Sequence, residues 1–283
     1  MLPPHDWPLR AHSISLEAGG LDWHVQRLGD GPGILCLHGT GASAHSFAGL
    51  ASALADSFEL VIPDLPGQGW TTPLPANQCH LDGFSSVLSR LIADLDFKPQ
   101  VIIGHSAGAA IAVHGALRHQ FTPDSIVSIN GAFLPFGHVA APVFSTAARW
   151  LSRSKVMAWI TAAHGLFERP IRHLLIETGS TPTRQMIDCY QTLLRNPDHI
   201  TGTLQMMAGW QLETLKRELP RLRTPLHLIT CSNDQTVSPW QSQRLSELVH
   251  NSQLHEIPSL GHLGHEEKPV QFAALIRDLI SLR

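Results

Sequence analysis

The segment 104–108, with the sequence GHSAG, has the residue types of a nucleophile held in a sharp turn. It follows the apolar run 101–103 and precedes the small-residue run 109–113, an order that predicts strand, turn and helix. A serine at such a junction has a strained backbone, and its hydroxyl lies at the strand end above a helix N-terminus. Glycines flank it because side chains there would collide with the neighbouring helix and strand. Ser106 is therefore the predicted nucleophile.

A serine hydroxyl needs a base to take its proton, and the base needs an acid that fixes its tautomer. Asp234 follows the predicted strand 226–230, and His262 follows the predicted strand 253–257. The order Ser, Asp, His along the chain suits this chemistry. Asn130, at the end of the strand before, cannot carry the acid's charge.

The assignments of Asp234 and His262 each have an alternative. Asp234 follows an asparagine, and Asn-Asp is a common turn dipeptide, so it could merely cap a turn. His265 is the alternative base, but it lies beside two glutamates and is expected to help begin the last helix. We favour His262 because it comes directly after the glycine that follows the strand.

The developing oxyanion of such a reaction needs two backbone N–H donors. We expect them from Ala107, next to the nucleophile, and from Thr40, between two glycines after the predicted strand 33–37. We expect His38 chiefly to hold this loop. The residues assigned tentatively to substrate binding are His38, Gly39, His105, Trp150, Trp159, Met207 and Trp210.

Runs of apolar residues alternate with helical patterns along most of the chain. This order predicts an α/β fold with a mostly parallel, eight-stranded sheet covered by helices on both faces. The alternation stops between residues 132 and 224, where the pattern is helical and interrupted by prolines. We therefore predict a core of residues 1–131 and 225–283 and a helical cap over the strand ends. The expected strands are 13–18, 21–28, 33–37, 59–63, 100–103, 125–129, 226–230 and 253–257, and the expected core helices are 44–55, 81–95, 107–119, 239–249 and 266–282.

Composition excludes several classes of protein. The chain has 283 residues, 43% of them hydrophobic and 15% charged, as in globular enzymes. We expect no signal peptide, no membrane-spanning helix and, from four cysteines without a C-x-x-C pair, a cytoplasmic location. The 18 histidines are scattered, and no nucleotide-binding motif is present, so we expect neither metal nor cofactor.

Charge is unevenly distributed. Residues 132–224 hold eleven Lys or Arg against six Asp or Glu, whereas the remainder holds nine against seventeen. Such a basic segment suits an anionic ligand or a membrane surface. The alternative is an ordinary solvated helix face.

With Ser106, Asp234 and His262 in place, the chain resembles the α/β-hydrolase superfamily over nearly its whole length. Stretches 21–27, 38–42, 104–110, 130–132, 195–199 and 206–210 look like the BchO family of magnesium-chelatase accessory proteins. One departure is Gln68, where many superfamily members have histidine in a D-x-P-G-H-G loop.

The resemblance implies a role near magnesium insertion into protoporphyrin in bacteriochlorophyll synthesis, contact with magnesium chelatase, and a cytoplasmic protein that touches the photosynthetic membrane. We interpret the chain as a serine hydrolase acting on an apolar ester or related carbonyl compound, such as a tetrapyrrole. The alternatives are a non-catalytic accessory protein that binds porphyrin or chelatase, and a cofactor-free haloperoxidase-like or C–C bond hydrolase. Fold and triad alone do not separate them.

Overall fold

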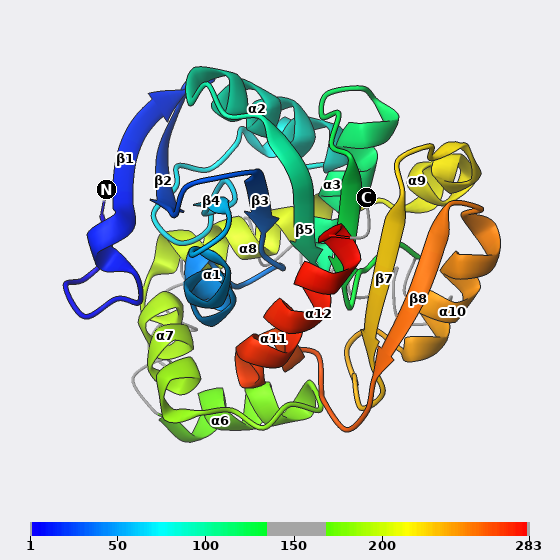
Figure 1. Ribbon diagram of the computed structural model, residues 1–283. Helices are drawn as coiled ribbons and strands as arrows, with labels where there is room; N and C mark the ends of the chain where they lie inside the picture. Colours follow the sequence, from blue (N-terminus) through cyan, green and yellow to red (C-terminus); the bar gives the residue numbers. More distant parts are fainter. Residues whose placement is uncertain (1, 135–167, 282–283) are drawn as a thin grey trace.

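A single sheet of eight strands forms the centre of the part that the computed structural model describes, residues 2–134 and 168–281 (Figure 1). The strand order is β1-β2-β4-β3-β5-β6-β7-β8. The pairs β1–β2 and β2–β4 are antiparallel, and all others are parallel, which confirms the predicted mostly parallel sheet. The strands are β1 (Ser13–Ala18), β2 (Leu21–Leu28), β3 (Gly33–Leu37), β4 (Glu59–Pro63), β5 (Pro99–His105), β6 (Ser125–Ile129), β7 (Leu226–Cys231) and β8 (Ser252–Ile257).

Burial follows position in the sheet. Every residue of β3, β6 and β7 is buried, because helices cover both faces of these parallel strands. The edge strands β1 and β8 expose part of their side chains. The continuous apolar runs in the sequence therefore correspond to the central strands.

Two apolar clusters, one on each face, hold helices to the sheet. One contains Leu88 of α2 (Leu81–Asp94), Ile111 of α3 (Ala107–Leu117) and Leu245 of α10 (Pro239–Leu248). The other contains residues of α1 (Ala48–Leu54) and α12 (Pro269–Ser281), among them Leu50, Phe272 and Ile276. The predicted helical layers on both faces are present.

Between β6 and β7 the described chain is helical, with α6 (Glu168–Glu177), α7 (Arg184–Leu194), α8 (Pro197–Gly209) and α9 (Glu213–Glu218). These helices approach the loops that follow the parallel strands. A Cβ on Gly202 of α8 would lie 1.8 Å from Gly67 O, in the loop after β4. A Cβ on Gly179, after α6, would lie 1.9 Å from Asn233 O, in the loop after β7. The cap boundaries at 132 and 224 stay predictions.

Two helices differ from expectation. The predicted helix 44–55 begins as a 3-10 turn, η2 (Ala44–Phe47), before α1. The predicted helix 266–282 is divided into α11 (Gly264–Glu267) and α12, because Pro269 begins a new helix at its first position. The break leaves His265 in a short helix of its own.

Candidate active site

The turn between β5 and α3 holds Ser106 in a strained backbone conformation. Its φ is 51° and its ψ is −116°, a region that non-glycine residues rarely adopt. A Cβ on Gly104 would lie 2.4 Å from Ala109 Cα, and one on Gly108 would lie 2.0 Å from Leu37 O. These close approaches confirm the collisions expected from the sequence. The turn therefore has the geometry of a nucleophile elbow.

The loops after β7 and β8 bring Asp234 and His262 together. Asp234 Oδ2 lies 2.7 Å from His262 Nδ1, and both side chains are buried. The N–H groups of Thr236 and Val237 donate to Asp234 Oδ1 at 2.7 and 2.9 Å. Asp234 thus caps its turn and also contacts the histidine. With Nδ1 directed at Asp234, Nε2 is the ring nitrogen that can exchange a proton with a substrate or nucleophile.

Asn130 links the strand before Asp234 to the loop that carries His262. Its Nδ2 donates to His262 O at 2.9 Å, and its Oδ1 accepts from Cys231 N at 2.8 Å. Its φ of 48° is in the left-handed region, which asparagine tolerates better than most residues. Sequence reasoning excluded Asn130 as the acid and missed this contact. Only its place at a strand end could have indicated it.

His105 is a second donor to the same carbonyl. Its Nε2 lies 3.0 Å from His262 O, and 2% of the residue is exposed. Burial holds the pKa of His105 well below its ordinary value, so the ring is neutral. The side chain is buried against the backbone of the loop that carries His262, and the tentative assignment of His105 to substrate binding stays a prediction.

The loop after β3 passes directly against the nucleophile. A Cβ on Gly39 would lie 3.0 Å from Ser106 Cβ. Thr40 follows and is partly exposed. Ala107 begins α3, and N–H groups in a first helical turn have no partner within the helix. The structure thus puts the segments of both expected oxyanion donors beside Ser106.

Gln68 joins this loop to α8. Its Oε1 accepts from Gly41 N at 2.6 Å, and its Nε2 donates to Met206 Sδ at 3.1 Å. The Thr40 hydroxyl lies 3.5 Å from the same sulfur. The glutamine that departs from the family pattern therefore fixes the loop backbone next to Thr40.

Both ring nitrogens of His38 form hydrogen bonds with backbone atoms. Nδ1 lies 2.8 Å from Gly39 O, and Leu65 N donates to Nε2 at 2.9 Å. The residue is fully buried. Its expected role in holding the loop agrees with these contacts. Its tentative assignment to substrate binding stays a prediction.

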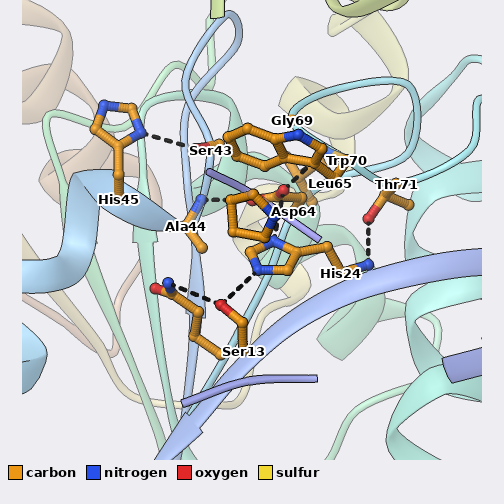
Figure 2. A network of polar contacts seen from close by, with 12 residues as sticks. Ser13, His24, Ser43, Ala44, His45, Asp64, Leu65, Gly69, Trp70 and Thr71 are labelled. Atoms are coloured by element: carbon orange, nitrogen blue, oxygen red, sulfur yellow. Dashed lines mark hydrogen bonds and ion pairs between the residues drawn. The ribbon is translucent and has the colours of Figure 1, made fainter. Parts of the chain in front are cut away.

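Asp64 holds the loops after β3 and β4 together (Figure 2). Its Oδ1 accepts from Ala44 N at 2.7 Å, and its Oδ2 accepts from Trp70 N at 2.9 Å and lies 2.8 Å from His24 Nδ1. Burial acts to raise the pKa of Asp64, but the contact with His24 and the backbone donors outweigh it and lower that pKa. The carboxylate is therefore a fixed anchor for the loop that carries Thr40.

The same network contains an Asp–His–Ser chain, because His24 Nε2 also lies 2.9 Å from Ser13 Oγ (Figure 2). Ser13 begins the antiparallel edge strand β1. It has neither the positive φ of Ser106 nor a helix that begins at the next residue with its N-terminus behind the hydroxyl. Ser13 thus shares the residue types of the proposed site but not its geometry.

Two more of the tentative substrate-binding residues, Met207 and Trp210, belong to the helical insertion. Met207 is half-buried in α8, and Trp210, which follows that helix, packs partly buried against the core. Trp150 and Trp159 lie outside the described residues.

No group of three or more potential metal ligands occurs within residues 2–134 and 168–281. In the same ranges no helix is long and apolar enough to cross a membrane. The four cysteines, Cys36, Cys79, Cys189 and Cys231, are buried free thiols.

Comparison with known proteins places this geometry in a family. The model of the alpha/beta hydrolase family matches residues 34–275. The chain belongs to the α/β-hydrolase family. It is 35% identical over 278 residues to the magnesium-chelatase 30 kDa subunit of Rhodobacter capsulatus, covering 97% of this chain and 96% of that protein. The resemblance seen in the sequence is thereby confirmed.

Two further relatives extend the comparison. A pimeloyl-[acyl-carrier protein] methyl ester esterase of Chromobacterium violaceum is 28% identical and covers 88% of this α/β-hydrolase and 96% of its own length. Among solved structures, the epoxide hydrolase CorEH has a TM-score of 0.79 at 18% identity, covering 96% of this chain and 99% of its own. At this identity the structure shows the fold alone.

Proposed function

We propose that this α/β-hydrolase is a serine hydrolase that cleaves an ester or a related carbonyl compound. The observation that carries the proposal is the 2.7 Å contact between Asp234 Oδ2 and His262 Nδ1, on loops at the strand ends where Ser106 has its strained turn. Family membership supports hydrolysis in general, and the esterase among the relatives supports an ester bond.

In the proposed reaction Ser106 Oγ attacks the substrate carbonyl while His262 Nε2 takes the hydroxyl proton. Asp234 fixes the imidazole and stabilises its charged form. The N–H groups of Thr40 and Ala107 donate to the oxyanion. His262 returns the proton to the leaving alcohol, which departs and leaves an acyl-serine. Water, deprotonated by His262, then releases the acid and restores Ser106.

We further propose a tetrapyrrole substrate in bacteriochlorophyll synthesis, with magnesium chelatase as partner. The name of the Rhodobacter relative supports this class. The basic excess of residues 132–224 suits a ligand with carboxylates. We propose a cytoplasmic protein that contacts the photosynthetic membrane peripherally.

A panel of p-nitrophenyl esters tests the chemistry. We expect the wild type to hydrolyse at least one ester and Ser106→Ala to lose that activity. Ser13→Ala is the matched control, because Ser13 belongs to the Asp64–His24–Ser13 chain, which has the same residue types as the proposed triad. Loss of activity in Ser13→Ala but not in Ser106→Ala would refute the assignment.

The name of the same relative favours a second candidate, a non-catalytic accessory protein of the chelatase. Complementation in a strain lacking the gene separates the two. A hydrolase requires that Ser106→Ala fail to restore pigment although the protein accumulates. Full restoration by Ser106→Ala would favour the accessory protein.

A further inference from the structure

A short turn of the helical insertion, Thr178, Gly179 and Ser180, lies between the loop that carries Asp234 and the loop that carries His262. It follows α6, and the helices α6 and α7 on its two sides lie together at one end of the molecule (Figure 1). We name these three residues the 178–180 turn. Its partners are more than fifty residues away in sequence, so nothing local in the chain indicates the contact.

The 178–180 turn bonds the backbone of both loops. Thr178 O accepts from Gln235 N at 3.2 Å and from His262 N at 3.1 Å. One carbonyl therefore accepts hydrogen bonds from the N–H of the proposed base and from the N–H of the residue after the proposed acid. Since a carbonyl oxygen has two lone pairs, these two donors saturate it.

Two side-chain contacts extend this pattern. Asn233 Nδ2 donates to Gly179 O at 2.6 Å, and Leu263 N donates to Ser180 Oγ at 2.9 Å. Asn233 directly precedes Asp234, and Leu263 directly follows His262. The turn thus forms hydrogen bonds with His262 itself and with the residues directly beside Asp234 and His262.

Packing between the turn and the loops leaves no space. Gly179 has a φ of +81°, and a Cβ there would lie 1.9 Å from Asn233 O. A Cβ on Gly261, the residue before His262, would lie 2.2 Å from Gly179 C. Backbone meets backbone on both sides, so a shift of the turn must move one loop or the other.

We infer that the 178–180 turn is a positioning element for the acid–base pair. The geometry of Asp234 and His262 then depends on the position of the helical insertion relative to their loops. This inference rests on the proposed serine chemistry. It identifies Gly179 and Ser180 as positioning residues that do not touch substrate. Displacement of a catalytic group by about 1 Å can lower a rate up to roughly a hundredfold.

The test compares two glycine variants by their rate of phosphonylation with a fluorophosphonate probe. Gly179→Ala introduces a methyl group against Asn233 O. Gly29→Ala is the matched control, because Gly29 has a φ of +78° and a Cβ there would lie 2.1 Å from Phe58 O. Gly29 precedes β3, at the end of that strand away from Ser106. Both variants carry the same backbone strain and a similar clash with a carbonyl.

We expect Gly179→Ala to be phosphonylated about ten to a hundred times more slowly than Gly29→Ala at temperatures where both are folded. Ester kinetics should show a lower kcat with little change in KM, because the turn orients the base rather than the substrate. Equal phosphonylation rates for the two variants would overturn the inference.

If Gly179→Ala does not fold, Ser180→Ala provides an independent test. It removes the acceptor of Leu263 N without adding an atom, and it should also lower kcat with KM retained. An unchanged kcat would overturn the inference. Failure of the proposed function has a different signature, since the wild type itself would then not react with the probe.

Discussion

At the scale of single residues, the two histidines that compete for the role of base have different environments. His262 Nδ1 faces Asp234, whereas His265 Nε2 lies 2.8 Å from Ser46 Oγ. His265 is fully buried, and its ring centroid lies 4.4 Å from that of His105. Burial first, and then the nearby histidines, lower the pKa of His265 to about 3. His265 is therefore a neutral core residue rather than only the start of a helix.

This difference predicts separate effects of two alanine substitutions. His262→Ala should lower ester turnover on the order of 10⁴-fold to 10⁶-fold, the range seen when a triad member is lost. His265→Ala should retain turnover per folded molecule but melt at lower temperature, because it leaves a cavity in the core. Turnover measured beside a thermal melt checks both. A larger loss of turnover in His265→Ala would contradict the assignment.

At the scale of elements, the oxyanion loop depends on Gln68, which reaches it from the next loop. Its amide holds Gly41 N and contacts Met206 of α8. Without it, the Gly41 N–H loses its acceptor and the backbone beside Thr40 can shift. The loop geometry therefore depends on a side chain that makes no proposed contact with substrate.

We predict that Gln68→Ala lowers kcat about tenfold to a hundredfold, by analogy with the loss of one oxyanion donor. Gln26→Ala is the matched control, since Gln26 is also a buried glutamine with a backbone partner. Its amide donates to Pro8 O at 2.7 Å. Steady-state ester kinetics on both variants measure the effect. Similar kcat values for the two variants would contradict the role of Gln68.

The sequence predicted those elements whose signals are local. The apolar runs marked all eight strands, and the glycines around Ser106 marked the turn, because each signal lies within a few residues. The 178–180 turn carried no such signal. Its partners come from loops far along the chain, and its small residues matter through packing that only the folded chain creates.

The boundaries of elements were harder to predict for a related reason. Pro269 suits the first turn of a helix as well as a break within one. The periodic apolar pattern continues through residues 266–282, so the pattern alone favoured one helix where the structure has two. Likewise, the polar contacts of Asn130 and Gln68 depend on which strand ends lie side by side.

At the scale of the whole molecule, buried titratable groups make stability depend on pH. Burial, the largest cause, lowers the pKa of His45 to about 3 and that of His199 to about 4. Their folded pKa values lie below the unfolded value of about 6.5. The unfolded chain therefore binds protons more readily, and the contribution of both histidines to folding stability is lost as pH falls below about 6.5. Glu266 has the opposite effect. Burial raises its pKa to about 7, so its contribution is greatest at low pH and is lost as pH rises from about 4.5 to 7.

We therefore predict that the melting temperature of the wild type falls as pH is lowered from 7 to 5. Glu266→Gln should make that fall steeper, because it removes a group that binds its proton more tightly in the folded state. The glutamine oxygen can still accept from Ser46 and Tyr190. Thermal melts across this pH range check the slope. A shallower slope in the variant would show that the sign is wrong.

The excess of Lys and Arg in residues 132–224, together with the tryptophans of this segment, leads to a prediction about ligand binding. Protoporphyrin or its magnesium complex should quench tryptophan fluorescence, and the affinity should fall as salt rises, because carboxylates meet an excess of Lys and Arg. A titration at two ionic strengths measures both effects. Binding that does not change with salt would contradict the electrostatic part, and absence of quenching would contradict the tetrapyrrole class.

Mass spectrometry of the fluorophosphonate-treated protein tests the central claim most directly. The account predicts one phosphonyl adduct per chain, on the peptide that contains Ser106, and no adduct after Ser106→Ala. It also predicts that the peptide containing Ser13 stays unmodified. A folded wild type without an adduct, or with its adduct on another residue, would contradict the account.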